Sequence, residues 1–234
     1  LNISAPEISS PEDYIRIFDR NGFFEPTSIS KDDISRNEMY KANAERTRFA
    51  ARFESYSDYL LSLNMTAEIE PFSSVYLPRI TQLTNKSNQF NLTTKRYTQN
   101  EIEEISRNRG YIHLYGRLED KFGDNGVVSV IIGKIEGGDL HIDLWLMSCR
   151  VLKRDMEYAM LDSLVEKCRE KNIKNIYGYY YKTKKNSMVS GLYKQFGFIE
   201  LYENEKGDSK WLLDISVYKN KNNVILVKER EETK

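Results

Sequence analysis

The fold is decided by the segment Leu140–Phe198, whose sequence is LHIDLWLMSCRVLKRDMEYAMLDSLVEKCREKNIKNIYGYYYKTKKNSMVSGLYKQFGF. It begins with an apolar strand (140–147), passes through a basic turn (148–155) and continues as an amphipathic helix. A second strand (175–181) follows, and the segment ends with a short helix. Because a helix connects the two strands, we expect them to run parallel. A strand that leads through a turn into a helix is a common phosphate-binding arrangement.

The flanking sequence predicts the rest of one sheet. Strands at 111–118 and 127–135 are joined by a turn that contains Asn125-Gly126, and Gly137-Gly138 forms a second turn into the strand at 140. A strand at 66–72 and helices at 74–88 and from Thr98 precede this antiparallel meander. A hairpin of 197–202 with 210–218 and an edge strand at 224–227 follow it. We therefore predict an α+β fold whose mixed, mostly antiparallel sheet is splayed between two central parallel strands and flanked by helices.

The N-terminal part has a different texture. It is rich in loops up to residue 28 and then predicts a long, polar helix from Ser28 to Phe53, which is typical of an arm or connector. We divide the chain into a helical arm (1–64), a domain (65–228) and a charged tail (229–234). Since the chain starts at Leu1, we expect a further segment upstream.

Composition excludes several function classes. The 35 basic and 35 acidic residues balance, so no overall charge favours nucleic acid or a membrane surface. No apolar run reaches the roughly 20 residues of a membrane helix. The two cysteines, Cys149 and Cys168, indicate reduced thiols in a cytoplasmic protein. His113 and His141 are isolated, and no cluster has the spacing of a metal site, so we expect no metal.

This layout resembles the GNAT acyltransferase fold, and Asn186–Phe198 is similar to the family's "N…Y…GF" ending. Longer strings, at 82–98, 120–126 and 146–152, resemble the C-terminal half of FkbH-like proteins, which form subfamily IIIC of the HAD-superfamily phosphatases. Residues 37–46 resemble the connector from the HAD-type half. The resemblance implies a part in polyketide biosynthesis, namely transfer of a glyceryl-type acyl unit to or from an acyl carrier protein. No Asp-x-Asp sequence, which the HAD half needs, occurs in this chain, so phosphatase chemistry lies outside it or is absent.

The resemblance also implies a thioester site in the splay, supplied by coenzyme A or by the phosphopantetheine of a carrier protein. The backbone of Leu146 and Met147 would polarise the carbonyl, and the turn that follows would hold phosphate. The family pattern there is Arg/Gln-x-x-Gly-x-Gly/Ala. Arg150 fits this pattern, whereas Lys153 and Asp155 replace the glycines. Two interpretations stay open: side-chain charge of Arg150, Lys153 and Arg154 compensates, or Asp155 caps the helix itself and occupies the amides.

Four further residues each have a functional and a structural interpretation. Tyr193 is either the acid that protonates a departing thiolate or a core tyrosine. Asn186 either contacts the pantetheine arm or caps a helix. Asp143 is either a base or a solvated or paired strand residue, on a face shared with His141 and Trp145 and opposite Leu140, Ile142, Leu144 and Leu146. Cys149 is either a nucleophile activated by its basic neighbour or a small buried hydrophobe.

The loop after the helix at 74–88 supplies the substrate candidates Lys86, Asn88, Gln89 and Asn91. They either bind a hydroxylated or phosphorylated acyl group or form a hydrogen-bonded helix end. Two functions thus remain: an acyltransferase that acts with a carrier protein, and a non-catalytic module that has lost its cofactor turn and docks a carrier protein for a HAD-type partner.

Overall fold

The computed structural model describes residues 8, 10–20 and 36–228. The chain forms two compact units, 1–44 and 45–234. In the first, a short 3-10 helix η1 (Pro11–Asp13) leads into α1 (Tyr14–Arg20). The border at residue 45 falls within the helix α3 (Arg36–Ala50). The predicted border was at residue 65. The predicted helix start at Ser28 lies outside the described residues.

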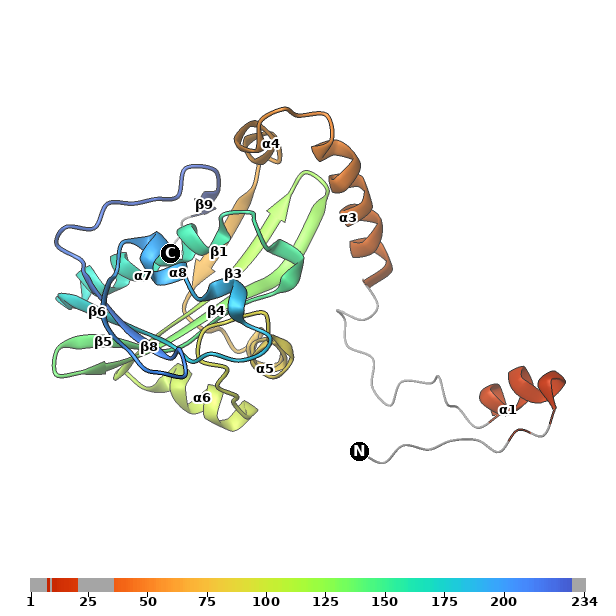
Figure 1. Cartoon of the computed structure of the whole chain (residues 1–234), viewed down its shortest axis with the longest axis horizontal. Coiled ribbons are helices and arrows are strands. Elements are labelled where there is room, and N and C mark those ends of the chain that lie inside the picture. The colour runs from red at the N-terminus through yellow and green to blue at the C-terminus, as the bar shows by residue number, and fades with distance from the viewer. Residues whose placement is uncertain (1–7, 9, 21–35, 229–234) are drawn as a thin grey trace, which may run out of the picture. The chain divides into compact units, whose positions relative to one another are not determined.

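The larger unit is built on one mixed sheet of nine strands (Figure 1). The strands are β1 (Thr66–Glu70), β2 (Phe90–Asn91), β3 (Tyr111–Asp120), β4 (Gly123–Glu136), β5 (Asp139–Met147), β6 (Asn175–Tyr180), β7 (Ile199–Glu203), β8 (Ser209–Asp214) and β9 (Leu226–Lys228). Their order is β7-β8-β6-β5-β4-β3-β1-β9, and β2 pairs with β5 outside this path. Strands β3, β4 and β5 form the predicted antiparallel meander. The predicted turn at Asn125-Gly126 is wrong, because β3 and β4 turn at Lys121-Phe122 and the Asn-Gly pair lies inside β4, next to an irregularity in the register.

The two central strands β5 and β6 are parallel but pair over a short length. Only Leu140 with Ile176 and His141 with Tyr177 are in register, after which the strands separate. The predicted splay is therefore confirmed, and so is the α+β fold class. The helix α7 (Met156–Glu170) crosses from the end of β5 to the start of β6, which makes the two strands parallel.

Helices cover both faces of the sheet and define two hydrophobic clusters. The helices α7 and α8 (Leu192–Phe196) pack on one face, and α5 (Leu77–Lys86) and α6 (Gln99–Arg107) pack on the other. Figure 1 shows these two pairs on opposite sides of the strands. The helix α4 (Tyr56–Ser62) packs with the α7 face. In α6, which begins after Thr98 as predicted, Thr98 and Glu101 form a capping box. No helix in the described ranges is long and apolar enough to cross a membrane.

The predicted faces of β5 are wrong beyond Asp143. All four leucine and isoleucine side chains were predicted to share one face. Leu140 and Ile142 lie in the hydrophobic cluster on the α7 face, but Leu144 and Leu146 lie in the cluster on the α5 face. The register explains the change, since Ile132 pairs with Leu144 and the next residue of β4 pairs with Ile142. Asp143 is therefore an extra residue, a β-bulge, and a bulge reverses the alternation of the side chains that follow it.

Candidate active site in the splay of the sheet

The splay between β5 and β6 is filled by the chain itself. The strand β2 pairs antiparallel with the end of β5, Phe90 opposite Met147 and Asn91 opposite Leu146. Leu92 continues this pairing, because its N–H donates to the Trp145 carbonyl at 3.0 Å. The carbonyl of Leu92 in turn accepts the N–H of Tyr181 at 2.9 Å, just beyond β6. Residues 90–92, which we call the closing segment, thus bridge the two separated strands.

This pairing occupies the backbone groups that were predicted to contact the thioester. Leu146 and Met147, whose backbone was expected to polarise a carbonyl, pair with β4 on one side and with β2 on the other. Thr93 extends the coverage, because its hydroxyl donates to the Asp143 carbonyl at 2.8 Å. The edge of β5 in the splay is thereby occupied from 143 to 147. A pantetheine arm could pair with this edge only if residues 90–93 left it.

Asn186 holds the closing segment in place. Its side chain is fully buried, and its Nδ2 donates to the carbonyls of Asn91 and Tyr181, each at 2.9 Å. Its Oδ1 accepts the Thr183 N–H at 2.8 Å, the Thr183 hydroxyl at 3.0 Å and the Tyr180 hydroxyl at 3.3 Å. It makes no side-chain cap to the 3-10 helix η3 (Ser187–Val189). Both polar atoms of Asn186 are therefore engaged with the chain itself, which favours a structural position over either the pantetheine contact or the helix cap.

Tyr193 lies in the core. It has no exposed surface, and its hydroxyl bonds only the backbone of Tyr179, accepting from the N–H at 3.3 Å and donating to the carbonyl at 3.4 Å. Its ring covers Gly178, where a Cβ would lie 2.4 Å from a ring carbon. Burial raises the pKa of Tyr193 far above its ordinary value. This geometry favours the core interpretation over a proton-donating acid.

The turn after β5 has a left-handed residue at both positions where the family pattern has glycine. Lys153 and Asp155, at the two glycine positions, both have left-handed conformations, with φ of 64° and 60°. Glycine adopts such angles at no steric cost, whereas other residues are strained by roughly 1–2 kcal/mol each. Asp155 is the N-cap residue of α7, yet its side chain makes no capping hydrogen bond. The expectation that its carboxylate occupies the first amides of α7 is therefore wrong.

The three basic residues of this turn have different surroundings. Arg154 is buried, and its guanidinium donates to Asp120 at 3.0 Å and to the Arg150 carbonyl at 2.9 Å. Asp120 also accepts two bonds of 2.8 Å from the buried Arg46, so one carboxylate serves two guanidiniums. Burial and the neighbouring Arg46 lower the pKa of Arg154. The guanidinium of Arg154 is thus engaged with Asp120, whereas Lys153 is exposed.

Arg150 lies in the 3-10 helix η2 (Cys149–Val151) and is half-buried. Its neighbour Cys149 is a free, exposed cysteine and not the buried hydrophobe of the structural interpretation. Exposure at the end of β5 is compatible with the nucleophile interpretation, which stays a prediction.

The sequence interpretation missed one acidic residue at the start of α7. Glu157 occupies the first turn of α7, and its Oε2 is buried without a hydrogen-bond partner among the described residues. Burial raises the pKa of Glu157 to about 7, and the nearby Asp155 adds to this effect. A carboxyl that titrates near neutrality is suited to proton transfer. In the sequence it is indistinguishable from an ordinary first-turn acid, because only the packing around it removes water.

The bulge at Asp143 presents its carboxylate to a small polar group. Lys95 forms an ion pair with it at 2.6 Å, and the Tyr97 hydroxyl donates to it. Burial and this carboxylate together raise the pKa of Tyr97. Asp143 is therefore a paired strand residue, as its structural interpretation states.

The predicted substrate residues divide into two groups. Asn91 is fully buried, donating to the Ser87 carbonyl at 3.2 Å and accepting the Thr94 N–H at 2.8 Å. Asn88 accepts from Arg96, which also binds carbonyls at the end of α5. Lys86 and Gln89 are exposed and remain candidates for substrate contact. Within the described ranges, no three His, Cys, Asp or Glu residues are grouped so as to hold a metal ion.

No family model matches the sequence, and no curated protein matches it. Solved structures of acetyltransferases do match. The ribosomal-protein-S18-alanine N-acetyltransferase from Escherichia coli is 12% identical with a TM-score of 0.48, and the match covers 68% of this chain and 99% of that one. The PaiA N-acetyltransferase from Thermoplasma acidophilum, solved with coenzyme A, is 17% identical with a TM-score of 0.47 and coverages of 64% and 99%.

A GNAT-family acetyltransferase from Staphylococcus aureus is 14% identical, with a TM-score of 0.48 and coverages of 64% and 99%. Because all three TM-scores lie below 0.5, the fold assignment rests on this chain's own strand order. The antiparallel meander, the helical crossover, the splayed parallel pair β5–β6 and the closing hairpin β7–β8 give the larger unit a GNAT-like fold.

Proposed function

We propose that this domain takes part in acyl transfer to or from an acyl carrier protein, and that it does so by binding the carrier rather than as a coenzyme A-dependent catalyst. The observation that carries the proposal is the closing segment, which occupies the β5 edge where a thioester of coenzyme A or of a carrier would react, whereas docking of the carrier protein and of its phosphate needs no access to that edge. The buried positions of Tyr193 and Asn186 support it, because neither side chain has a free polar atom directed at a ligand. The FkbH-like strings in the sequence supply the carrier protein as partner.

The turn before α7 supports binding of a carrier more than binding of coenzyme A. The pantetheine arm of a carrier protein is attached through one phosphodiester, whereas coenzyme A presents a pyrophosphate. Of the three predicted cations, Arg154 is committed to Asp120, and Lys153 is exposed. A single exposed lysine next to a helix N-terminus is suited to one phosphate charge. In the FkbH-like context the acyl group is of glyceryl type, and a HAD-type domain supplies the chemistry.

A second candidate is catalysis of acyl transfer by this domain itself. It is favoured by the left-handed conformations at Lys153 and Asp155, the two positions where the family pattern has glycine. It is also favoured by Glu157, a carboxyl with a pKa near neutrality beside that turn. Catalysis would require the closing segment to leave β5, which breaks its pairing with both separated strands.

Titration calorimetry separates the two candidates. The chain is titrated with coenzyme A, with pantetheine 4′-phosphate and with a carrier protein in its apo and phosphopantetheinylated forms. We expect the modified carrier to bind more tightly than coenzyme A, and Lys153→Glu to weaken that binding by about fivefold to tenfold, in line with loss of one charge contact and its replacement by repulsion.

The matched control is Lys174→Glu, an exposed lysine beyond the other end of α7, which should leave the affinity unchanged. Tighter binding of coenzyme A than of the carrier, or turnover of acetyl-coenzyme A, would refute carrier binding as the principal role and establish the second candidate.

A further inference from the structure

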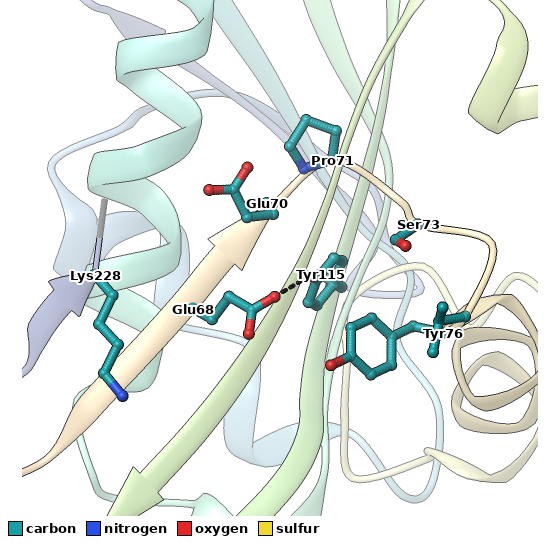
Figure 2. Close-up of a pocket in the computed structure, with 8 residues that line it drawn as sticks. Glu68, Glu70, Pro71, Ser73, Tyr76, Tyr115 and Lys228 are labelled. Carbon is teal, nitrogen blue, oxygen red and sulfur yellow. Dashed lines mark hydrogen bonds between the residues drawn. The ribbon is translucent and has the colours of Figure 1, made fainter. Parts of the chain in front are cut away.

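A cavity of about 430 Å³ lies near the edge of the sheet that β1 and β9 form, away from the splay. It is formed by β1, β3, β9 and the loop that leads into α5, and its walls include Glu68, Glu70, Ser73, Tyr76, Tyr115 and Lys228 (Figure 2). In the strand order, β4 lies between the strands of the cavity and the β5–β6 pair. Its volume lies in the range of pockets that hold small molecules. None of its residues belongs to the splay or to the turn before α7.

Two tyrosine rings form the aromatic wall of this cavity. The rings of Tyr76 and Tyr115 are 4.8 Å apart between centroids and tilted by 52°. The Tyr115 hydroxyl donates to the Glu68 carboxylate, as the dashed line in Figure 2 shows. Burial and this carboxylate raise the pKa of Tyr115, so its phenol stays protonated and neutral. The wall therefore combines electron-rich ring faces with a fixed carboxylate.

The cations around the cavity are paired with carboxylates outside it, whereas the carboxylates of its wall are weakly paired or unpaired among the described residues. Glu68 lies 3.7 Å from Arg117, whose guanidinium makes its shorter contact, 2.5 Å, with Asp124. The amine of Lys228 pairs with Glu119 at 3.6 Å rather than with either wall carboxylate. The Glu70 carboxylate has no ion pair or hydrogen bond within the part of the chain that the structure describes.

We propose that this cavity binds a small alkylammonium ion. A positive charge placed over the accessible face of the Tyr76 ring would interact with its π electrons, and the carboxylates of Glu68 and Glu70 would neutralise it. The alkyl body of the ion would contact the apolar part of the wall, Pro71 and Val75. Anionic ligands are disfavoured, because the nearby cations are already paired with Asp124 and Glu119. The site is independent of the carrier-binding role proposed above.

The test compares a cation with its neutral isostere. Choline, butylammonium and 3,3-dimethyl-1-butanol are titrated into the isotopically labelled chain at low ionic strength, where screening is weak. Binding is followed by shifts of the backbone amides of β1 and β3. We expect choline or butylammonium to bind about tenfold more tightly than the neutral alcohol, and these two arms distinguish a quaternary from a primary ammonium ion.

Glu70→Gln removes one charge without changing the size of the side chain, and we expect it to weaken cation binding by about fivefold or more. The matched control is Glu205→Gln, at an exposed position in the turn between β7 and β8, which should leave the affinity unchanged. Three results would overturn the proposal: no binding of either cation at about 50 mM; equal binding of the neutral alcohol; or an unaltered dissociation constant in Glu70→Gln.

Discussion

Replacement of Asn186 by alanine distinguishes a structural residue from a cofactor ligand. The side chain makes five hydrogen bonds between 2.8 and 3.3 Å, and its two bonds to carbonyls join the closing segment to the end of β6. In Asn186→Ala, the Thr183 N–H and the carbonyls of Asn91 and Tyr181 lose this buried partner. Each unsatisfied buried group costs roughly 1–3 kcal/mol. Allowing for local relaxation, we expect the free energy of unfolding to fall by about 4 kcal/mol.

The assay is urea unfolding followed by tryptophan fluorescence, with hydrogen exchange of the Tyr181 amide as a local probe. That amide donates to the Leu92 carbonyl, so its exchange should accelerate as the closing segment loosens. Asn100→Ala is the matched control. It lies exposed in α6, and its free energy of unfolding should stay within about 0.5 kcal/mol of the original. A loss below about 1 kcal/mol in Asn186→Ala, with unaltered exchange, would refute the structural role.

Three further predictions concern other buried positions. Asp120→Ala leaves two buried guanidiniums without their carboxylate, so unfolding by urea should show a loss of about 3–5 kcal/mol; a loss under 1 kcal/mol would contradict this. Gly178→Ala places a Cβ 2.4 Å from the buried Tyr193 ring and should cost about 3 kcal/mol, whereas Gly191→Ala, with open space around it, should cost less than 1. Burial raises the pKa of Glu157 from 4.5 to about 7, so between pH 4.5 and pH 7 the folded state holds a proton that the unfolded state has lost. The free energy of unfolding should therefore fall by up to about 3 kcal/mol as the pH rises from 4.5 to 7. Glu157→Gln should remove that part of the pH dependence, and an unaltered slope would contradict it.

The sequence alone determined the architecture of the domain. The turn signal at Gly137-Gly138 set the β4–β5 hairpin, and the apolar spacing after residue 155 set the crossover helix that makes β5 and β6 parallel. The signal at Asn125-Gly126 was misleading, because β3 and β4 turn at Lys121-Phe122 and the Asn-Gly pair lies inside β4. These signals are local, since turn conformation and helical periodicity depend on neighbours along the chain. The capping box at Thr98 was predictable for the same reason.

Only the tertiary structure decided which groups of the site are engaged by the chain itself. The bulge at Asp143, the burial of Arg154 against Asp120 and the closing segment all join residues far apart in sequence. Asn186 reaches Asn91 across 95 positions. Nothing in the string around Asn186 reveals whether its amide faces a ligand or another backbone, because a polar side chain satisfies its hydrogen bonds with whichever partner the packing brings to it. The sequence therefore determined the splay, and packing decided that the chain itself fills it.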